Sequence, residues 1–159
     1  MFMRHSIRTG FSFGITSGII TTLGLIVGLE STTGSGLIVI GGILIIAIAD
    51  SLSDAMGIHV SEESESIHST KEIWESTISC FLSKFFITLT FILPVLLLQL
   101  SIAIIICVIW GFFLIIFFSY YLAKKQDKNP YKIIIEHLVL ATIIIIVTHY
   151  VGKWIATLI

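Results

Sequence analysis

Two aspartates, Asp50 and Asp54, lie four residues apart in an otherwise apolar stretch of the chain. On an α-helix, residues at this spacing are about 40° apart around the axis and share a face. An ionised carboxylate in hydrocarbon costs roughly 2.5–3.5 kcal/mol, and two on one face also repel each other. A proton, a bound cation or a basic neighbour removes that cost. The pair therefore predicts chemistry that involves a positive charge.

Three interpretations of this pair remain open from the sequence alone. In the first, the two aspartates line a path for a cation or a proton. In the second, they form a structural pair with Lys84, which lies about two turns inside a later apolar stretch and must either snorkel or meet an acid. In the third, the helix that carries the pair begins or ends elsewhere, so that Asp54 lies at the water interface.

Further candidate residues follow the pair along the chain. Met56 lies close to Asp54 in sequence, and its thioether is either a packing group or a soft metal ligand. An acidic link, residues 61–75, comes next. Carboxylates and imidazoles are ligands for divalent metals, so this link is either a solvated loop or a cation-collecting cytoplasmic mouth. The mouth residues would be Glu62, Glu63, Glu65 and His68.

The elements that must position these residues are membrane-spanning helices. Of the 159 residues, 56% are hydrophobic and only 12% are charged, whereas soluble domains carry about a quarter charged residues. So much apolar surface requires lipid as its solvent. We expect an all-α membrane protein with a single transmembrane domain over residues 1–159. Its five spans, each long enough to cross about 30 Å of hydrocarbon, are 11–29, 35–60, 78–98, 101–122 and 133–158.

Link lengths and positive charges predict the topology. The first and third links are short, which favours tight antiparallel hairpins, and Pro94 should kink the third span. With five spans, most of the Lys and Arg residues fall on one side, so the N-terminus is predicted in the cytoplasm and the C-terminus outside. These residues are Arg4, Arg8, Lys71, Lys124, Lys125, Lys128 and Lys132.

Glycines recur at four-residue spacing in the first span, at Gly14 and Gly18 and again at Gly24 and Gly28. Small residues at this spacing let helix backbones approach closely. The contact they serve is either packing within the chain or the seam of a homodimer.

Several function classes find no support in the sequence. The net charge of −1 gives no nucleic-acid footprint. Cys80 and Cys107 lie in apolar runs and are interpreted as small buried side chains rather than a disulfide or a metal pair. No HExxH, Gly-x-Ser-x-Gly or phosphate-loop pattern is present, so we do not expect an enzyme.

Three segments, taken in order along the chain, resemble the vacuolar iron transporter family. They are residues 15–28, 52–61 and 128–153. The middle one, Leu-Ser-Asp-Ala-Met-Gly-Ile-His-Val-Ser, is similar to the family's Leu-Ser-Met-Ala-x-Gly-Glu-x-Val-Ser. The resemblance implies five spans and a homodimer whose first two spans line a divalent-metal path. It also implies proton-driven export of Fe²⁺ or Mn²⁺ from the cytosol with no permanently bound cofactor, and we expect the cell membrane as its location.

The chain departs from this family pattern at several positions. The family's aspartate of the first span falls on Ser17, its methionine on Asp54, and its glutamate on Ile58. The short acidic link replaces the family's metal-binding insertion. Asp50 and Asp54 restore carboxylates to the path, and carboxylate in place of thioether favours harder ions such as Mn²⁺, Mg²⁺ and Fe²⁺.

Two hypotheses follow. The first is a dimeric divalent-cation transporter whose path is lined by Ser17, Asp50, Asp54 and Met56. The second is a non-transporting membrane scaffold or sensor, in which an aspartate pairs with Lys84 as a structural counter-ion.

Overall fold

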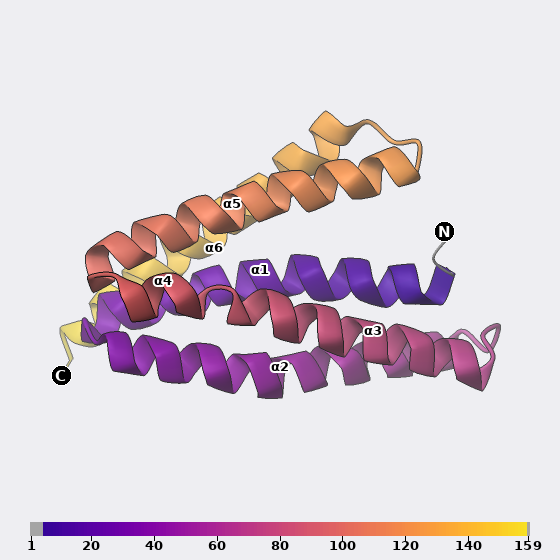
Figure 1. Ribbon diagram of the computed structural model, residues 1–159, viewed down its shortest axis with the longest axis horizontal. Coiled ribbons are helices and arrows are strands. Elements are labelled where there is room, and N and C mark those ends of the chain that lie inside the picture. The colour runs from indigo at the N-terminus through magenta and orange to yellow at the C-terminus, as the bar shows by residue number, and fades with distance from the viewer. Residues whose placement is uncertain (1–4, 159) are drawn as a thin grey trace.

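The computed structural model describes residues 5–158, which form antiparallel helices joined by short links (Figure 1). Five helical segments are long and apolar enough to cross a membrane, which confirms the prediction of five spans. No strand occurs within the described residues. The helices are α1 (His5–Thr33), α2 (Gly36–Ser64), α3 (Thr70–Leu89), α4 (Ile92–Leu97), α5 (Leu100–Lys125) and α6 (Pro130–Ala156).

Side-chain caps and one glycine set the ends of these helices. Gly34 has a φ of 60°, a conformation that glycine adopts without strain, and it makes the tight turn between α1 and α2. The hydroxyl of Ser35 then accepts a hydrogen bond from the backbone N–H of Ile38 and caps α2. Asn129 caps α6 in the same way, with Pro130 in the first turn.

The third span is broken, as Pro94 predicted. α3 ends at Leu89 and the short α4 begins at Ile92. Proline has no N–H to donate to the carbonyl four residues earlier, which here belongs to Thr90. The amides of Thr90 and Phe91 bond instead to carbonyls three residues back, each at 3.2 Å. This tightened turn lets α4 continue across the membrane at a new angle.

The acidic link differs from the prediction of a loop over residues 61–75. α2 continues to Ser64 and α3 already begins at Thr70, so only residues 65–69 lie outside a helix. Ser69 and Glu72 form a reciprocal capping box that starts α3 early. The mouth residues are therefore divided between a helix end and a short turn.

α1 is the central helix, and it packs against α2, α3, α5 and α6. Its glycines serve this internal packing rather than leaving a free seam. An added Cβ at Gly14 would meet Cys80 and Ser83 of α3, and one at Gly24 would meet Ile144 and Thr148 of α6. Within the described chain, the glycine spacing of the first span is thus used for close contacts with two different helices.

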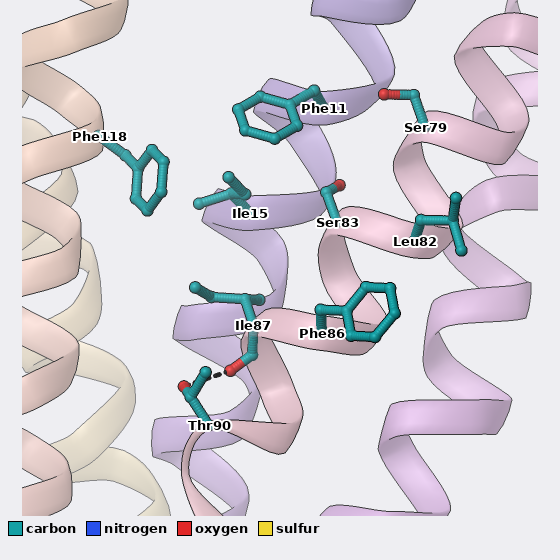
Figure 2. A pocket seen from close by; sticks show the side chains of 9 residues that line it. All are labelled: Phe11, Ile15, Ser79, Leu82, Ser83, Phe86, Ile87, Thr90 and Phe118. Atoms are coloured by element: carbon teal, nitrogen blue, oxygen red, sulfur yellow. Dashed lines mark hydrogen bonds between the residues drawn. The ribbon is translucent and has the colours of Figure 1, made fainter.

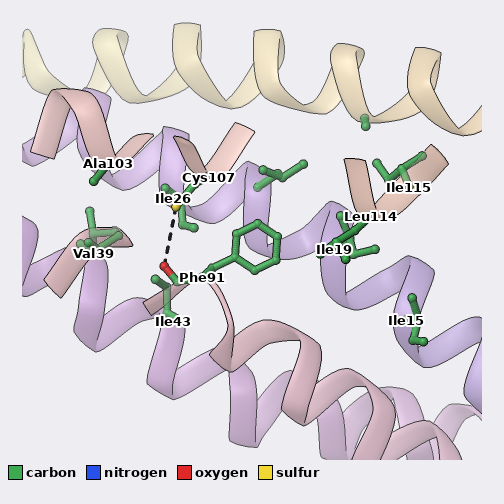
Figure 3. Close-up of a cluster of buried hydrophobic side chains, with 13 residues drawn as sticks. Ile15, Ile19, Ile26, Val39, Ile43, Phe91, Ala103, Cys107, Leu114 and Ile115 are labelled. Atoms are coloured by element: carbon green, nitrogen blue, oxygen red, sulfur yellow. Dashed lines mark hydrogen bonds between the residues drawn. The ribbon is translucent and has the colours of Figure 1, made fainter. Parts of the chain in front are cut away.

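The apolar core is concentrated toward the end of the molecule where α1 meets α2 and α4 meets α5. Phe91 is fully buried there, and its carbonyl accepts a 3.6 Å hydrogen bond from the thiol of Cys107 (Figure 3). Ile26, Val39 and Ile43 are also fully buried. Both cysteines are unpaired and buried, as predicted.

The opposite end of the molecule holds the beginning of α1, the α2–α3 link and the α5–α6 link (Figure 1). Lys71 and the lysines of residues 124–132 therefore gather at this end. Five antiparallel spans place the second and fourth links on the same side, so this grouping is expected. Arg4 lies outside the described residues. We call this the lysine-rich end; that it faces the cytoplasm stays a prediction.

Candidate functional site

Lys84 is the centre of a charged cluster inside the helix bundle. Its ammonium nitrogen lies 2.6 Å from Oδ2 of Asp50 and 2.5 Å from Oδ2 of Asp54. The contact with Asp54 is a hydrogen bond, whereas that with Asp50 is an ion pair without hydrogen-bond geometry. The aspartate spacing on α2 thus does place both carboxylates on one face, and α3 supplies the positive charge between them.

Ser17 joins α1 to the same cluster. Its hydroxyl donates a 2.6 Å hydrogen bond to Oδ2 of Asp54 and accepts a 3.0 Å hydrogen bond from Lys84. The next residue, Gly18, lets α1 approach the lysine, because an added Cβ there would lie 3.2 Å from Cγ of Lys84. We call Ser17, Asp50, Asp54 and Lys84 the charged cluster; it connects the first three spans.

The members of the charged cluster differ in exposure. The side chain of Lys84 is only 1% exposed, whereas those of Asp50 and Asp54 are 33% and 21% exposed. Lys84 therefore approaches the carboxylates from the inside of the bundle, and their other side remains open. Two carboxylates and one ammonium group also leave one negative charge in excess.

These contacts bear on the interpretations left open by the sequence. Asp54 lies ten residues before the end of α2, so the helix does not end near it, and its distance from the water interface stays a prediction. The contact between the aspartates and Lys84 is present. A cation path and a structural role both remain compatible with it, because the carboxylates are open on one side.

Met56 is not part of the charged cluster, contrary to the prediction. Its side chain is 58% exposed and lines a separate groove with His59 and Trp74, between α2 and α3. The reason is helical geometry: two residues correspond to about 200° of rotation, so Met56 and Asp54 point in nearly opposite directions.

The predicted mouth residues do not form one cluster either. Glu62 is buried, being only 6% exposed, whereas Glu63 and Glu65 are exposed. His68 lies 3.3 Å from Glu65 in the turn. No group of three or more His, Cys, Asp or Glu side chains in residues 5–158 is placed to hold a metal ion.

The sequence reasoning missed the hydroxyl of Thr88, which lies on the side of the charged cluster toward the apolar core. Thr22 of α1 donates a 3.2 Å hydrogen bond to Thr88 of α3, and both side chains are fully buried. Thr88 comes one helical turn after Lys84 and therefore shares its face. The four-residue spacing from Lys84 could have predicted that Thr88 faces the interior of the bundle.

An apolar groove is lined by none of the residues of the charged cluster. It has a volume of about 480 Å³ and lies between α1, α3 and α5 (Figure 2). Its walls are mainly apolar, and the hydroxyls of Ser79, Ser83 and Thr90 donate to backbone carbonyls of their own chain. The groove therefore offers an apolar surface of the kind that lipid chains cover, and no set of groups for chemistry.

The fold and the charged cluster define a multi-pass helical membrane protein with an ionic centre inside its bundle. No known protein family, curated protein or solved structure matches the chain.

Proposed function

We propose that this protein carries a divalent cation, Fe²⁺ or Mn²⁺, across a membrane in exchange for protons. Asp50 and Asp54 would hold the cation or the proton, and Lys84 would act as a tethered positive charge that partly neutralises the empty site. Carboxylate oxygens suit these comparatively hard divalent ions.

The observation that carries this proposal is the excess negative charge of the cluster. Lys84 contacts both aspartates at once and neutralises only one of two carboxylates. A net charge inside the span is costly, so a proton or a metal ion that reaches the second carboxylate is stabilised there. Exchange between the two is the transport step that such a site supports.

The partial exposure of both carboxylates supports the proposed access of a cation. Lys84 contacts Oδ2 of Asp50 and Oδ2 of Asp54 from the buried side, while both carboxylates are partly exposed on the other side. Neither carboxylate is enclosed by the rest of the chain. A cation that arrives on the open side therefore meets both aspartates without first displacing the lysine.

We also propose that a second copy of the chain covers this open side. α2 presents small exposed residues at four-residue spacing, namely Ala49, Ser53, Gly57 and Ser61. An added Cβ at Gly57 would meet nothing within 4 Å. Small residues at this spacing favour close helix contacts in membranes, and a partner chain would shield the aspartates from lipid.

A second candidate function is a membrane scaffold or sensor without transport. The short contacts of Lys84 favour it, because they tie α1, α2 and α3 together through Ser17, Asp50 and Asp54. In that case the charged cluster is a structural device and the excess charge has no transported partner.

Transport into liposomes separates the two candidates. The purified full chain should take up Mn²⁺ or Fe²⁺ and release protons, which a metal-sensitive and a pH-sensitive dye report together. Asp54→Asn should abolish both signals because the carboxylate that binds the cation is gone. Asp127→Asn makes the same chemical change in the exposed α5–α6 link and should leave both signals intact.

Two results would contradict transport at this site. Uptake that is unchanged in Asp54→Asn would remove this residue from the mechanism. No uptake by the wild-type chain, together with a loss of stability in Asp54→Asn that Lys84→Met restores, would favour the scaffold instead.

A further inference from the structure

Glu62 is a buried carboxylate outside the charged cluster. Its residue is 6% exposed, and its Oε2 atom has no hydrogen-bond partner among the described residues. An unpaired buried polar atom is costly, and the cost is larger for a charged group. Such an atom is therefore suited to a ligand that is not always present.

The position of Glu62 on α2 connects it with the charged cluster. Asp54, Ile58 and Glu62 follow one another at four-residue spacing, so each lies about 40° further around the helix than the last, and Glu62 is about 80° from Asp54. Glu62 is eight residues beyond Asp54, which corresponds to about 12 Å along the axis. Ile58 lies between the two carboxylates in this row of side chains.

The contacts of the neighbouring helices place Glu62 at the lysine-rich end of the bundle. The Ser17–Asp54 contact between antiparallel helices sets a register in which Glu62 lies opposite the first turns of α1. The 2.9 Å contact between His59 and Thr77 likewise sets a register in which Glu62 lies opposite the first turns of α3.

The first turns of α1 and α3 carry further buried polar side chains at the same end of the bundle. Ser6 and Ser76 are both buried there. The hydroxyl of Ser6 donates a 3.2 Å hydrogen bond to Glu75, and that of Ser76 donates to the carbonyl of Ile73. The interior at this end of the bundle is therefore partly polar.

The adjacent glutamates provide a contrast. Glu63 is exposed to solvent, and Glu65 lies beside His68. Only Glu62 turns inward, although all three belong to the same acidic segment. Its orientation follows from the helical register of α2, which continues beyond the predicted end of the span.

We propose that Glu62 is a separate cation-binding position, from which a divalent cation passes along α2 to Asp54. The passage of the cation to Asp54 rests on the proposed transport function. The binding of a divalent cation at Glu62 can be measured without transport.

Mn²⁺ binding to the purified full chain, followed by electron paramagnetic resonance, tests this position. In the Asp50→Asn/Asp54→Asn variant, Mn²⁺ binding at Glu62 should persist. Adding Glu62→Gln, which keeps the size of the side chain, should weaken the remaining binding about tenfold or more. Adding Glu63→Gln instead should leave it unchanged, and Glu62→Asp should retain binding because it keeps a carboxylate.

Equal Mn²⁺ binding with and without Glu62→Gln in that background would overturn the inference, as would an equal loss from Glu63→Gln. Melting temperatures of all variants show whether each is folded, and the Glu62→Asp variant keeps the test decisive if Glu62→Gln does not fold. In liposomes, Glu62→Gln in the otherwise wild-type chain should slow Mn²⁺ uptake at limiting Mn²⁺. Retained binding without any wild-type uptake would refute the transport proposal and leave the binding site standing.

Discussion

At the scale of residues, the dominant feature is a fully buried lysine that shares two carboxylates. Removing a charged group from water costs several kcal/mol in proteins, and close partners offset that cost. Lys84 has two such partners and a hydroxyl, from Asp50, Asp54 and Ser17. Because either aspartate alone can still pair with the lysine, the two carboxylates are partly redundant for stability.

This redundancy predicts non-additive effects on stability. Asp50→Asn or Asp54→Asn alone should lower the free energy of unfolding by only about 1 kcal/mol, because one ion pair with Lys84 remains. The double variant should lose about 3–5 kcal/mol, since it leaves a buried ammonium group unpaired. Unfolding of the detergent-solubilised chain measures these differences.

Lys84→Met provides the matched control in the double-asparagine background. It removes the unpaired charge at similar volume and should restore most of the lost stability. Strictly additive losses from the two asparagine substitutions would show that the carboxylates do not share the lysine.

At the scale of elements, α1 and α2 use their small residues differently. The glycines of α1 lie in close contacts with α3 and α6, so the central helix can pack tightly against its neighbours. On α2, Gly41 and Gly57 have open space where a side chain would be. Gly41 and Gly57 thus leave a free surface on α2, although Gly42 of the same helix packs against Leu25 and Leu29 of α1.

Alanine substitutions test this difference between the helices. A Cβ at Gly10 would collide with the backbone carbonyl of Ser76 and approach the backbone of Cys80, so α1 and α3 would have to separate. We expect Gly10→Ala to destabilise the protein by about 1–3 kcal/mol. Gly57→Ala should be neutral or stabilise by up to about 1 kcal/mol, because alanine favours helix and meets no neighbour.

Thermal melting of both alanine variants in the same detergent measures the difference. Equal melting temperatures for the two would contradict the close α1–α3 contact at Gly10.

At the scale of the whole molecule, the charged cluster lies between two unlike halves of the bundle. Toward the lysine-rich end, the interior of α1, α2 and α3 contains the buried polar residues Ser6, Glu62 and Ser76. Toward the other end, the apolar core around Phe91 fills the interior (Figure 3). Under the proposed transport function, this asymmetry favours exchange of ions with the lysine-rich side.

The proposed second copy also belongs to this scale. Gly57→Leu should weaken self-association of the chain in lipid, because it adds a bulky side chain to the small exposed stripe of α2. It should leave the fold of each copy unchanged, since nothing lies within 4 Å of the added Cβ. Energy transfer between labelled chains in liposomes, measured over a dilution series, reports the association.

Met56→Leu is the control for this variant, because it replaces an exposed side chain one residue earlier on α2. Equal self-association of wild type and Gly57→Leu would place any dimer contact elsewhere.

The sequence by itself determined the helical class, the five spans, the break near Pro94 and the shared face of Asp50 and Asp54. These features depend on local properties: the length of apolar runs, the missing amide of proline and the 100° rotation per residue of a helix. The position of Met56 could have been derived from the same rotation. The early start of α3 could have been derived from its capping box.

Only the tertiary structure decided which groups meet across helices. Lys84 lies 30 residues from Asp54 and 67 from Ser17 in sequence, yet all three share one hydrogen-bond network. Which residues meet depends on the rotation and register of the helices, and close packing at glycines such as Gly18 sets both. For the same reason, the inward orientation of Glu62 and the internal use of the α1 glycines became evident only once α1, α2 and α3 were packed together.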